Sequence, residues 1–214
     1  MTSLAEAKKI MGRNFIGFNE IKHFSSYLPL DFSFIIPAIP YGPEFLKDKQ
    51  KDFLLILGCK NTKDGSLLTI KKIRDTFGVD PMKKEACLYN QDWYLNEKFI
   101  KNQTLKNQWY LIRKKVLYDT RGIDPDVKPS VILKKESLPS AILATYTFFV
   151  YYYLTGGIKL WKHNFIWCND RDHNGDRIYV GRYEDPKKIN KNGFNIHRHL
   201  SISKVFACIT QIPL

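Results

Sequence analysis

Residues 170–176 combine three carboxylates, an amide, an imidazole and a glycine between two strand-like runs. Asp170 and Asp172 stand at alternate positions ahead of Gly175, and oxygen ligands spaced in this way can fold around a hard cation. The same residues also suit a hairpin turn, because the pair Asn174-Gly175 favours positive φ at both central positions. The sequence therefore predicts either a loop that binds a divalent metal ion or a charged hairpin whose acids pair with nearby arginines.

A second pattern follows near the C-terminus, where His197 and His199 are separated by one residue. On a strand this spacing aims both imidazoles at one face. Two imidazoles on one face form half of a site for zinc, iron or another transition metal, which a carboxylate or a third histidine completes. The alternative is a half-exposed strand with hydrogen-bonded histidines. The candidate metal ligands are Asp170, Asp172, His197 and His199, with His163, His173 and Cys168 as further possibilities for the third position.

A third pattern is the stretch 98–118, which contains six basic residues and no acid. Basic side chains follow phosphates while interleaved aromatic faces stack on bases, so the stretch indicates a surface for RNA or single-stranded nucleic acid. The alternative is a strand edge that lysines protect from pairing with other chains. The candidate nucleic-acid-binding residues are Lys98, Lys101, Lys106, Trp109, Arg113, Lys114 and Lys115.

The net charge of the chain favours the same kind of ligand. The chain has 214 residues and a formal net charge of +13, which favours contact with nucleic acid or another polyanion. Lysine outnumbers arginine 26 to 8, a bias that coding preference also produces. We therefore expect a basic protein that binds nucleic acid or another polyanion. The alternative is a metal-dependent hydrolase or nuclease that uses the Asp170 loop with His197 and His199, for which the only cofactor would be a divalent metal ion.

The elements that must position these residues are predicted from capping and periodicity. Ser3 and Glu6 form a capping box ahead of a short helix at 4–11, and the proline-rich segment 29–43 is an extended connector. A buried strand is expected at 53–58, an amphipathic helix at 69–77 and a strand within 107–118. The nearly continuous apolar run 138–154, with Pro139 at its start and Gly156 after its end, predicts a central buried helix.

The last quarter of the chain reads as β structure. Strands are expected at 158–168, 177–183, 194–200 and 203–209, forming an antiparallel sheet packed on the long helix. The prediction is a single α+β domain over residues 1–214, with a soft boundary in the loop 119–136. It consists of an N-terminal helical and extended portion, the central buried helix and the C-terminal antiparallel sheet.

The apolar segments, the N-terminus and the cysteines also indicate the cellular compartment of the protein. The apolar run 138–154 is shorter than the roughly 20 residues that a membrane span needs, and it contains tyrosines. The N-terminus lacks the pattern of a secretion signal. The four cysteines show no CxxC spacing, so we expect reduced, buried thiols and a cytoplasmic protein without a membrane partner.

Three segments taken in order resemble a group of uncharacterised bacterial proteins that carry a DGDRxYVG-like segment near the C-terminus. They are the segment 109–114, the tripeptide Pro139-Ser140-Ala141, and the run from Asp170 to Gly181. The resemblance spans about the second half of the chain. It implies a bacterial, cytosolic protein and transfers no activity.

Overall fold

The computed structural model describes residues 1–132, 135–185 and 192–213, which form an α+β fold with two mixed four-stranded sheets. The α-helices are α1 (Leu4–Met11), α2 (Phe18–Phe24), α3 (Pro43–Lys49), α4 (Ile70–Phe77), α5 (Lys98–Lys101) and α6 (Ala141–Leu154). The strands are β1 (Phe15–Ile16), β2 (Phe53–Leu57), β3 (Trp109–Arg113), β4 (Phe165–Arg171), β5 (Arg177–Gly181), β6 (Asn195–His197), β7 (Phe206–Ala207) and β8 (Gln211–Ile212). Three 3₁₀ turns, η1 (Gly12–Asn14), η2 (Tyr118–Thr120) and η3 (Pro129–Val131), complete the described elements.

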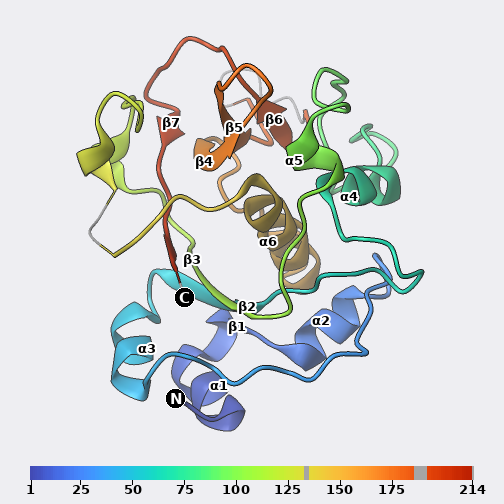
Figure 1. The fold of residues 1–214 in the computed structure, drawn as a ribbon, viewed down its shortest axis with the longest axis vertical. Coiled ribbons are helices and arrows are strands. Elements are labelled where there is room, and N and C mark those ends of the chain that lie inside the picture. The colour runs from blue at the N-terminus through green and yellow to red at the C-terminus, as the bar shows by residue number, and fades with distance from the viewer. Residues whose placement is uncertain (133–134, 186–191, 214) are drawn as a thin grey trace.

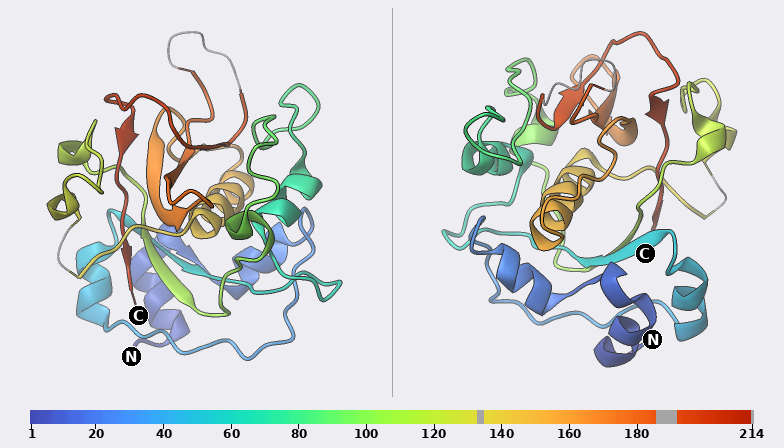
Figure 2. Two further views of the ribbon diagram at one scale, coloured as in Figure 1. Left: turned by 45° about the horizontal axis from the view of Figure 1, so that its top comes forward. Right: turned by 180° about the vertical axis from the view of Figure 1, so that it is seen from behind.

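The first sheet has the order β1-β2-β3-β8. Strand β2 is buried along its whole length, as its unbroken apolar sequence predicts, and it pairs antiparallel with β3 through Leu55 and Leu111. Helices α1 and α3 lie on the far side of this sheet from α6 (Figures 1 and 2). Helix α2 instead contacts α6, with the ring of Phe24 6.4 Å from that of Tyr146. The sheet is therefore covered on both faces.

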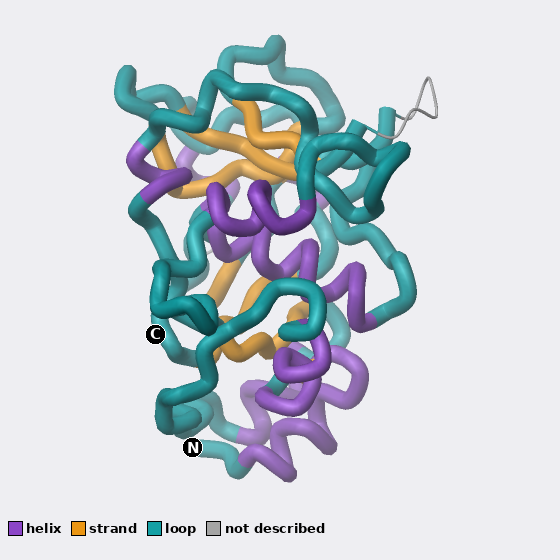
Figure 3. Tube along the Cα trace, turned by 90° about the vertical axis from the view of Figure 1, so that its right-hand side faces the viewer, coloured by secondary structure: helices purple, strands orange, loops and turns teal. Residues whose placement is uncertain are grey.

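Helix α6 lies between the two sheets, and Figure 3 shows it as the middle layer of the molecule. The predicted central helix is confirmed, with its start moved to Ala141 because Ser140 caps it by accepting from Leu143 N at 3.2 Å. Its first ten residues are buried. The hydroxyl of Tyr146 donates to the carbonyl of Leu57 at 3.1 Å and so ties the helix to β2. Across the described ranges, no helix is both long and apolar enough to cross a membrane.

The second sheet has the order β6-β5-β4-β7. Its β4-β5 and β5-β6 pairs are antiparallel as predicted. The prediction of a wholly antiparallel C-terminal sheet is wrong, because β7 runs parallel to β4, with Phe165 opposite Phe206. The chain then leaves this sheet, and β8 pairs with β3 of the first sheet, Ile212 opposite Leu111. Hydrophobic patterning marks where a strand lies but does not encode its partner.

The core is continuous from α1 to β6. One cluster of buried side chains includes Ala7, Leu54, Phe148 and Ile196, which come from α1, from both sheets and from the helix between them. The four cysteines are buried and carry free thiols, as expected. This packing fixes the position of the β4-β5 connection, which carries the Asp170–Asp176 pattern.

Candidate functional site

The connection between β4 and β5 is a tight hairpin turn. Gly175 N donates to Asp172 O at 3.1 Å, Asp172 N donates to Asp176 O at 3.0 Å, and Gly175 has φ +88°. This is a three-residue loop closed by a left-handed glycine. Asp172 Oδ1 also accepts from Asn174 N at 2.8 Å and Asp176 N at 2.9 Å. The side chain of Asp172 therefore holds the turn in shape.

The charge of Asp172 is compensated from the neighbouring strand end. Its side chain is fully buried, and its Oδ2 forms an ion pair with the guanidinium of Arg198. The same guanidinium lies over the ring of Trp93, 4.6 Å from the centroid. Burial of a carboxylate is costly unless it is paired and hydrogen-bonded, and Asp172 meets both conditions. We call residues 172–176 the Asp172 turn.

Asp170 contacts helix α6 and not the turn. Its Oδ2 accepts from Ala141 N at 2.5 Å, so the carboxylate sits at the N-terminus of α6, where a negative charge complements the helix dipole. Burial raises the pKa of Asp170 above its usual value. The expectation that Asp170 and Asp172 point into one loop is not met, because Asp170 faces the helix while Asp172 faces the turn and Arg198.

The two histidines of the HxH pattern do not share a strand face, so that prediction is wrong. Strand β6 ends at His197, and His199 has φ +62°, which lies outside a strand conformation. The ring of His197 stacks on Tyr179 with centroids 5.9 Å apart, and burial lowers the pKa of His197. His199 instead turns to the hairpin, where its Nε2 lies 2.5 Å from Asp176 Oδ2. The pairing of β5 with β6 brings His199 to the turn.

Within the described residues, two groups of three side chains bring possible metal-ligand atoms within 4.8 Å of one another. The first group is Glu97, Asp172 and His173, and the second is Asp172, Asp176 and His199. Asp172 belongs to both. Of the four predicted metal ligands, the structure thus brings together Asp172 and His199, while Asp170 and His197 stand in neither group.

Glu97 and His173 form the closest contact of the first group. Glu97 Oε1 lies 2.5 Å from His173 Nδ1, and Glu97 Oε2 accepts from His173 N at 3.1 Å. The carboxylate is 8% exposed and the imidazole 66% exposed. A buried carboxylate therefore fixes the ring of a largely exposed histidine. Sequence reasoning missed Glu97, since the two residues are 76 positions apart and only tertiary folding joins them.

A cleft of about 690 Å³ opens beside this pair. It lies between the segment that leads into α5 and the Asp172 turn, and its lining residues are Trp93, Asn96, Glu97, Lys98, Arg171, Asp172 and His173. We call it the Trp93–His173 cleft. Its two acids are buried, whereas Lys98, Arg171 and His173 are exposed. The groups that face solvent are therefore cationic or neutral.

A smaller cavity of about 220 Å³ lies on the other side of the turn and includes Asp126, Asp176, Arg177 and His199 in its wall. Asp126 accepts from Arg171 at 2.6 Å and pairs also with Arg177, which holds the pKa of this carboxyl below its usual value. The arginines of the second sheet thus largely neutralise the local acids. This is the charge compensation expected of a hairpin with structural acids.

The basic stretch 98–118 does not form a single stacking surface. The prediction that Trp109 stacks on bases is wrong, because its indole is 1% exposed and donates to Pro37 O at 2.8 Å. Arg113 pairs with Glu136 at 3.3 Å, and Lys114 donates to Asn14 Oδ1 at 2.7 Å. The members that stay exposed are Lys98, Lys101, Lys106 and Lys115.

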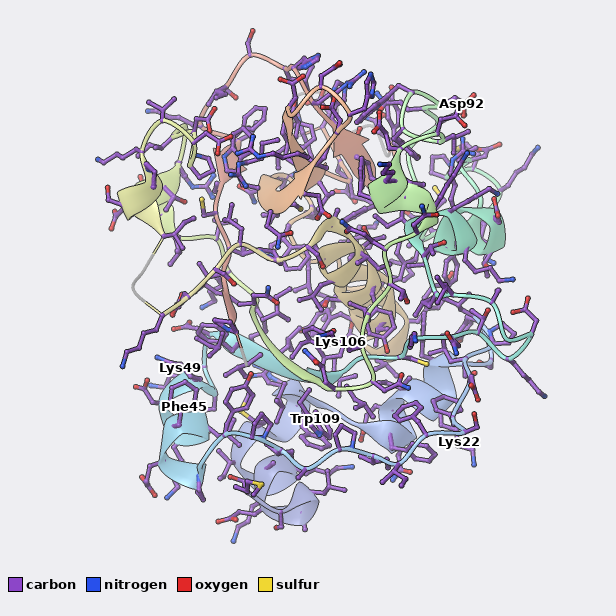
Figure 4. The ribbon with its side chains drawn as sticks, viewed as in Figure 1. Lys22, Phe45, Lys49, Asp92, Lys106 and Trp109 are labelled. Carbon is purple, nitrogen blue, oxygen red and sulfur yellow. The ribbon has the colours of Figure 1, made fainter. Side chains whose placement is uncertain are left out.

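Of these exposed lysines, Lys98 and Lys101 share the short helix α5. In Figure 4, Lys106 and Trp109 lie over the first sheet, while Asp92, which precedes the cleft residue Trp93, lies at the other end of the molecule. Of the predicted nucleic-acid-binding residues, only Lys98 lines the Trp93–His173 cleft.

Comparison of the chain with protein-family models, with curated proteins and with solved structures gave no match. The resemblance to the bacterial group with a DGDRxYVG-like segment therefore stays a prediction.

Proposed function

We propose that this protein binds a phosphate-bearing polyanion, nucleic acid being the class that its charge fits, in the Trp93–His173 cleft. The observation that carries the proposal is the division of charge in this cleft. Lys98, Arg171 and His173 face solvent, while Glu97 and Asp172 are buried and paired. An exposed cationic rim attracts phosphates, and the ring of half-buried Trp93 offers an apolar surface beside it.

The net charge of +13 supports the same proposal. Summed charge raises the local concentration of a polyanion and speeds its encounter with the protein. The cleft then supplies the place where such a ligand is held. Among the described residues no acid pairs with Lys98, whereas Arg171 donates to Gly175 O at 2.7 Å and pairs with Asp126, so Lys98 contributes most of the positive charge of this rim.

The test is binding of fluorescently labelled single-stranded RNA and DNA, measured by anisotropy at several salt concentrations. We expect dissociation constants of about 10⁻⁴–10⁻⁶ M near physiological salt, with steep weakening as salt increases, because bound phosphates release counterions. Lys98→Glu should weaken binding and reduce the salt slope by about 1. Lys22→Glu is the matched control, since Lys22 is exposed on α2 away from the cleft (Figure 4). No binding at low salt, or equal losses in both variants, would refute the proposal.

A second function is favoured by one specific observation, the two groups of possible ligands that share Asp172. Carboxylate oxygens and imidazole nitrogens suit zinc and manganese. Asp172 already accepts three hydrogen bonds, from Arg198, Asn174 N and Asp176 N. An ionised carboxylate has about four acceptor positions, so a metal ion would take the remaining one. The corresponding activity is metal-dependent hydrolysis of a phosphate ester, in which the arginines of the second sheet would bind the phosphate of the substrate.

This second function has its own test, the melting temperature with zinc, manganese or calcium. A metal at one hundred times its dissociation constant stabilises the fold by about 2.7 kcal/mol, which is about 5–11 °C for a chain of this size. The rise should vanish in His199→Ala and Asp176→Asn and persist in His23→Ala, a control on exposed His23 of α2. Indifference to all three metals would remove this function.

A further inference from the structure

The Glu97–His173 pair joins a buried carboxylate, 8% exposed, to an imidazole that is 66% exposed. Both oxygens of Glu97 are committed to His173, one to its ring and one to its backbone N–H. The ring is thereby held at the wall of the cleft with its Nδ1 edge against Glu97.

The tautomer of His173 follows from its partner. An ionised carboxylate only accepts hydrogen bonds, so Nδ1 of a neutral His173 must carry the proton that it donates to Glu97. Nε2 is then the unprotonated nitrogen. Within the described part of the chain no residue hydrogen-bonds Nε2, so its lone pair is available to a molecule in the cleft. A histidine whose ring is oriented by a carboxylate is the arrangement of a general base.

We propose that the Trp93–His173 cleft cleaves RNA, with His173 as the general base and Glu97 as its positioning residue. The inference rests on the proposed binding of nucleic acid and names its substrate class. The reason for RNA is the nucleophile. Among the described residues that line the cleft there is no serine, threonine or cysteine, so the nucleophile must come from the substrate or from water. In RNA the 2′-hydroxyl is already beside the phosphorus, and such intramolecular placement is worth many orders of magnitude in effective concentration.

The step balances as follows. His173 Nε2 takes the proton of the 2′-hydroxyl, O2′ bonds to the adjacent phosphorus, and the bond from phosphorus to O5′ breaks. O5′ leaves with the electron pair and takes a proton from water, and the protonated His173 returns its proton to solvent. The products are a 2′,3′-cyclic phosphate and a 5′-hydroxyl. Lys98 and Arg171, which line the same cleft, place positive charge near the phosphate as negative charge develops on it.

Glu97→Gln is the most informative variant, because it keeps the shape of the side chain and reverses the tautomer. The amide oxygen of the glutamine can still accept from His173 N, but its N–H₂ group must donate to Nδ1. The proton of the imidazole is then placed on Nε2, where it blocks proton acceptance. His173→Ala removes the base altogether, and the high exposure of His173 makes this change mild for the fold. His23→Ala is the control for loss of an exposed histidine.

The experiment is cleavage of end-labelled RNA by a saturating excess of the full-length protein in EDTA, so that the rate reports chemistry and not affinity. We expect His173→Ala and Glu97→Gln to lose about 10²–10⁴-fold in rate, the range that a general base contributes, and His23→Ala to keep the wild-type rate. Glu97→Gln should bind RNA with the wild-type affinity in the anisotropy assay, so that its loss is confined to the rate of cleavage. DNA of the same sequence should bind and stay intact.

The outcomes separate the two proposals. RNA that binds in the anisotropy assay but is not cleaved overturns the catalytic inference and leaves binding in place, whereas RNA that does not bind overturns both. Cleavage at equal rates in wild type and His173→Ala also overturns the inference. So does a product ending in a plain 3′- or 5′-phosphate formed from both RNA and DNA, since water would then be the nucleophile. Activity that EDTA abolishes would assign the chemistry to the metal-ligand groups instead.

Discussion

Replacing Phe148 with alanine tests the central position of α6. The side chain is 0% exposed, and its ring lies 4.5 Å from that of Phe194 and 5.5 Å from that of Tyr183, both from the second-sheet half of the chain. Burying a phenylalanine is worth about 1.5–3 kcal/mol, and two aromatic pairs add about 1–3 kcal/mol. The sum agrees with the loss of about 3–5 kcal/mol seen when buried phenylalanines become alanine.

The assay is equilibrium unfolding in urea, supported by thermal melting. At about 2–4 °C per kcal/mol for a chain of this length, the melting temperature should fall by about 6–20 °C. The matched control is Phe45→Ala on α3, where the ring is 39% exposed (Figure 4) and the expected loss is about 1 kcal/mol or less. A loss under about 1 kcal/mol for Phe148→Ala, at an unchanged urea m-value, would refute the placement of this ring in the core.

Two further predictions concern pH. Burial raises the pKa of Asp170, so the folded state disfavours its ionised form, and the stability present below about pH 3.9 should be lost as pH rises through the raised pKa. Asp170→Asn can still accept from Ala141 N, so its free energy of unfolding in urea should increase relative to that of the wild type as pH rises from about 3.5 to 7. A difference that stays constant over this range would contradict the prediction. Burial lowers the pKa of His197, so its contribution is present above about pH 6.5 and lost as pH falls. His197→Gln should accordingly lose less stability than the wild type between about pH 7 and 5, and equal acid sensitivity would contradict it.

Helices α1, α4 and α6 were predictable because their signals are local, whereas α3 and α5 were not predicted. Ser3 caps α1 by accepting from Glu6 N, and Thr69 caps α4 by accepting from Lys72 N. Gly12 and Gly78 end these helices, as their positions in the sequence indicate. Each of these signals acts over three or four residues, within the reach of sequence reasoning. The same holds for β2, whose unbroken apolar run required burial on both faces.

The sheet partners and the site were less predictable, because they depend on contacts between distant residues. The residues near β8 carry no local signal that would predict its pairing with β3 instead of β7. Likewise, Asp170 and Asp172 look alike in sequence, but one is used by the N-terminus of α6 and the other by Arg198. The strand pairing that brings His199 to the turn was within reach, since it needed only β5 and β6 to be neighbours.

The same contacts distinguish His173 from the other side chains of this turn. Asp172 has its oxygens occupied by two backbone N–H groups and a guanidinium, and His199 is held by Asp176. These residues satisfy one another and make the hairpin rigid. His173 is different, because Glu97 occupies its Nδ1 and leaves the opposite nitrogen beside the cleft. General-base catalysis needs a base whose ring is held in place while its proton-accepting nitrogen stays available. The contact of Glu97 with Nδ1 of His173 meets this need, because it fixes the ring through the other nitrogen.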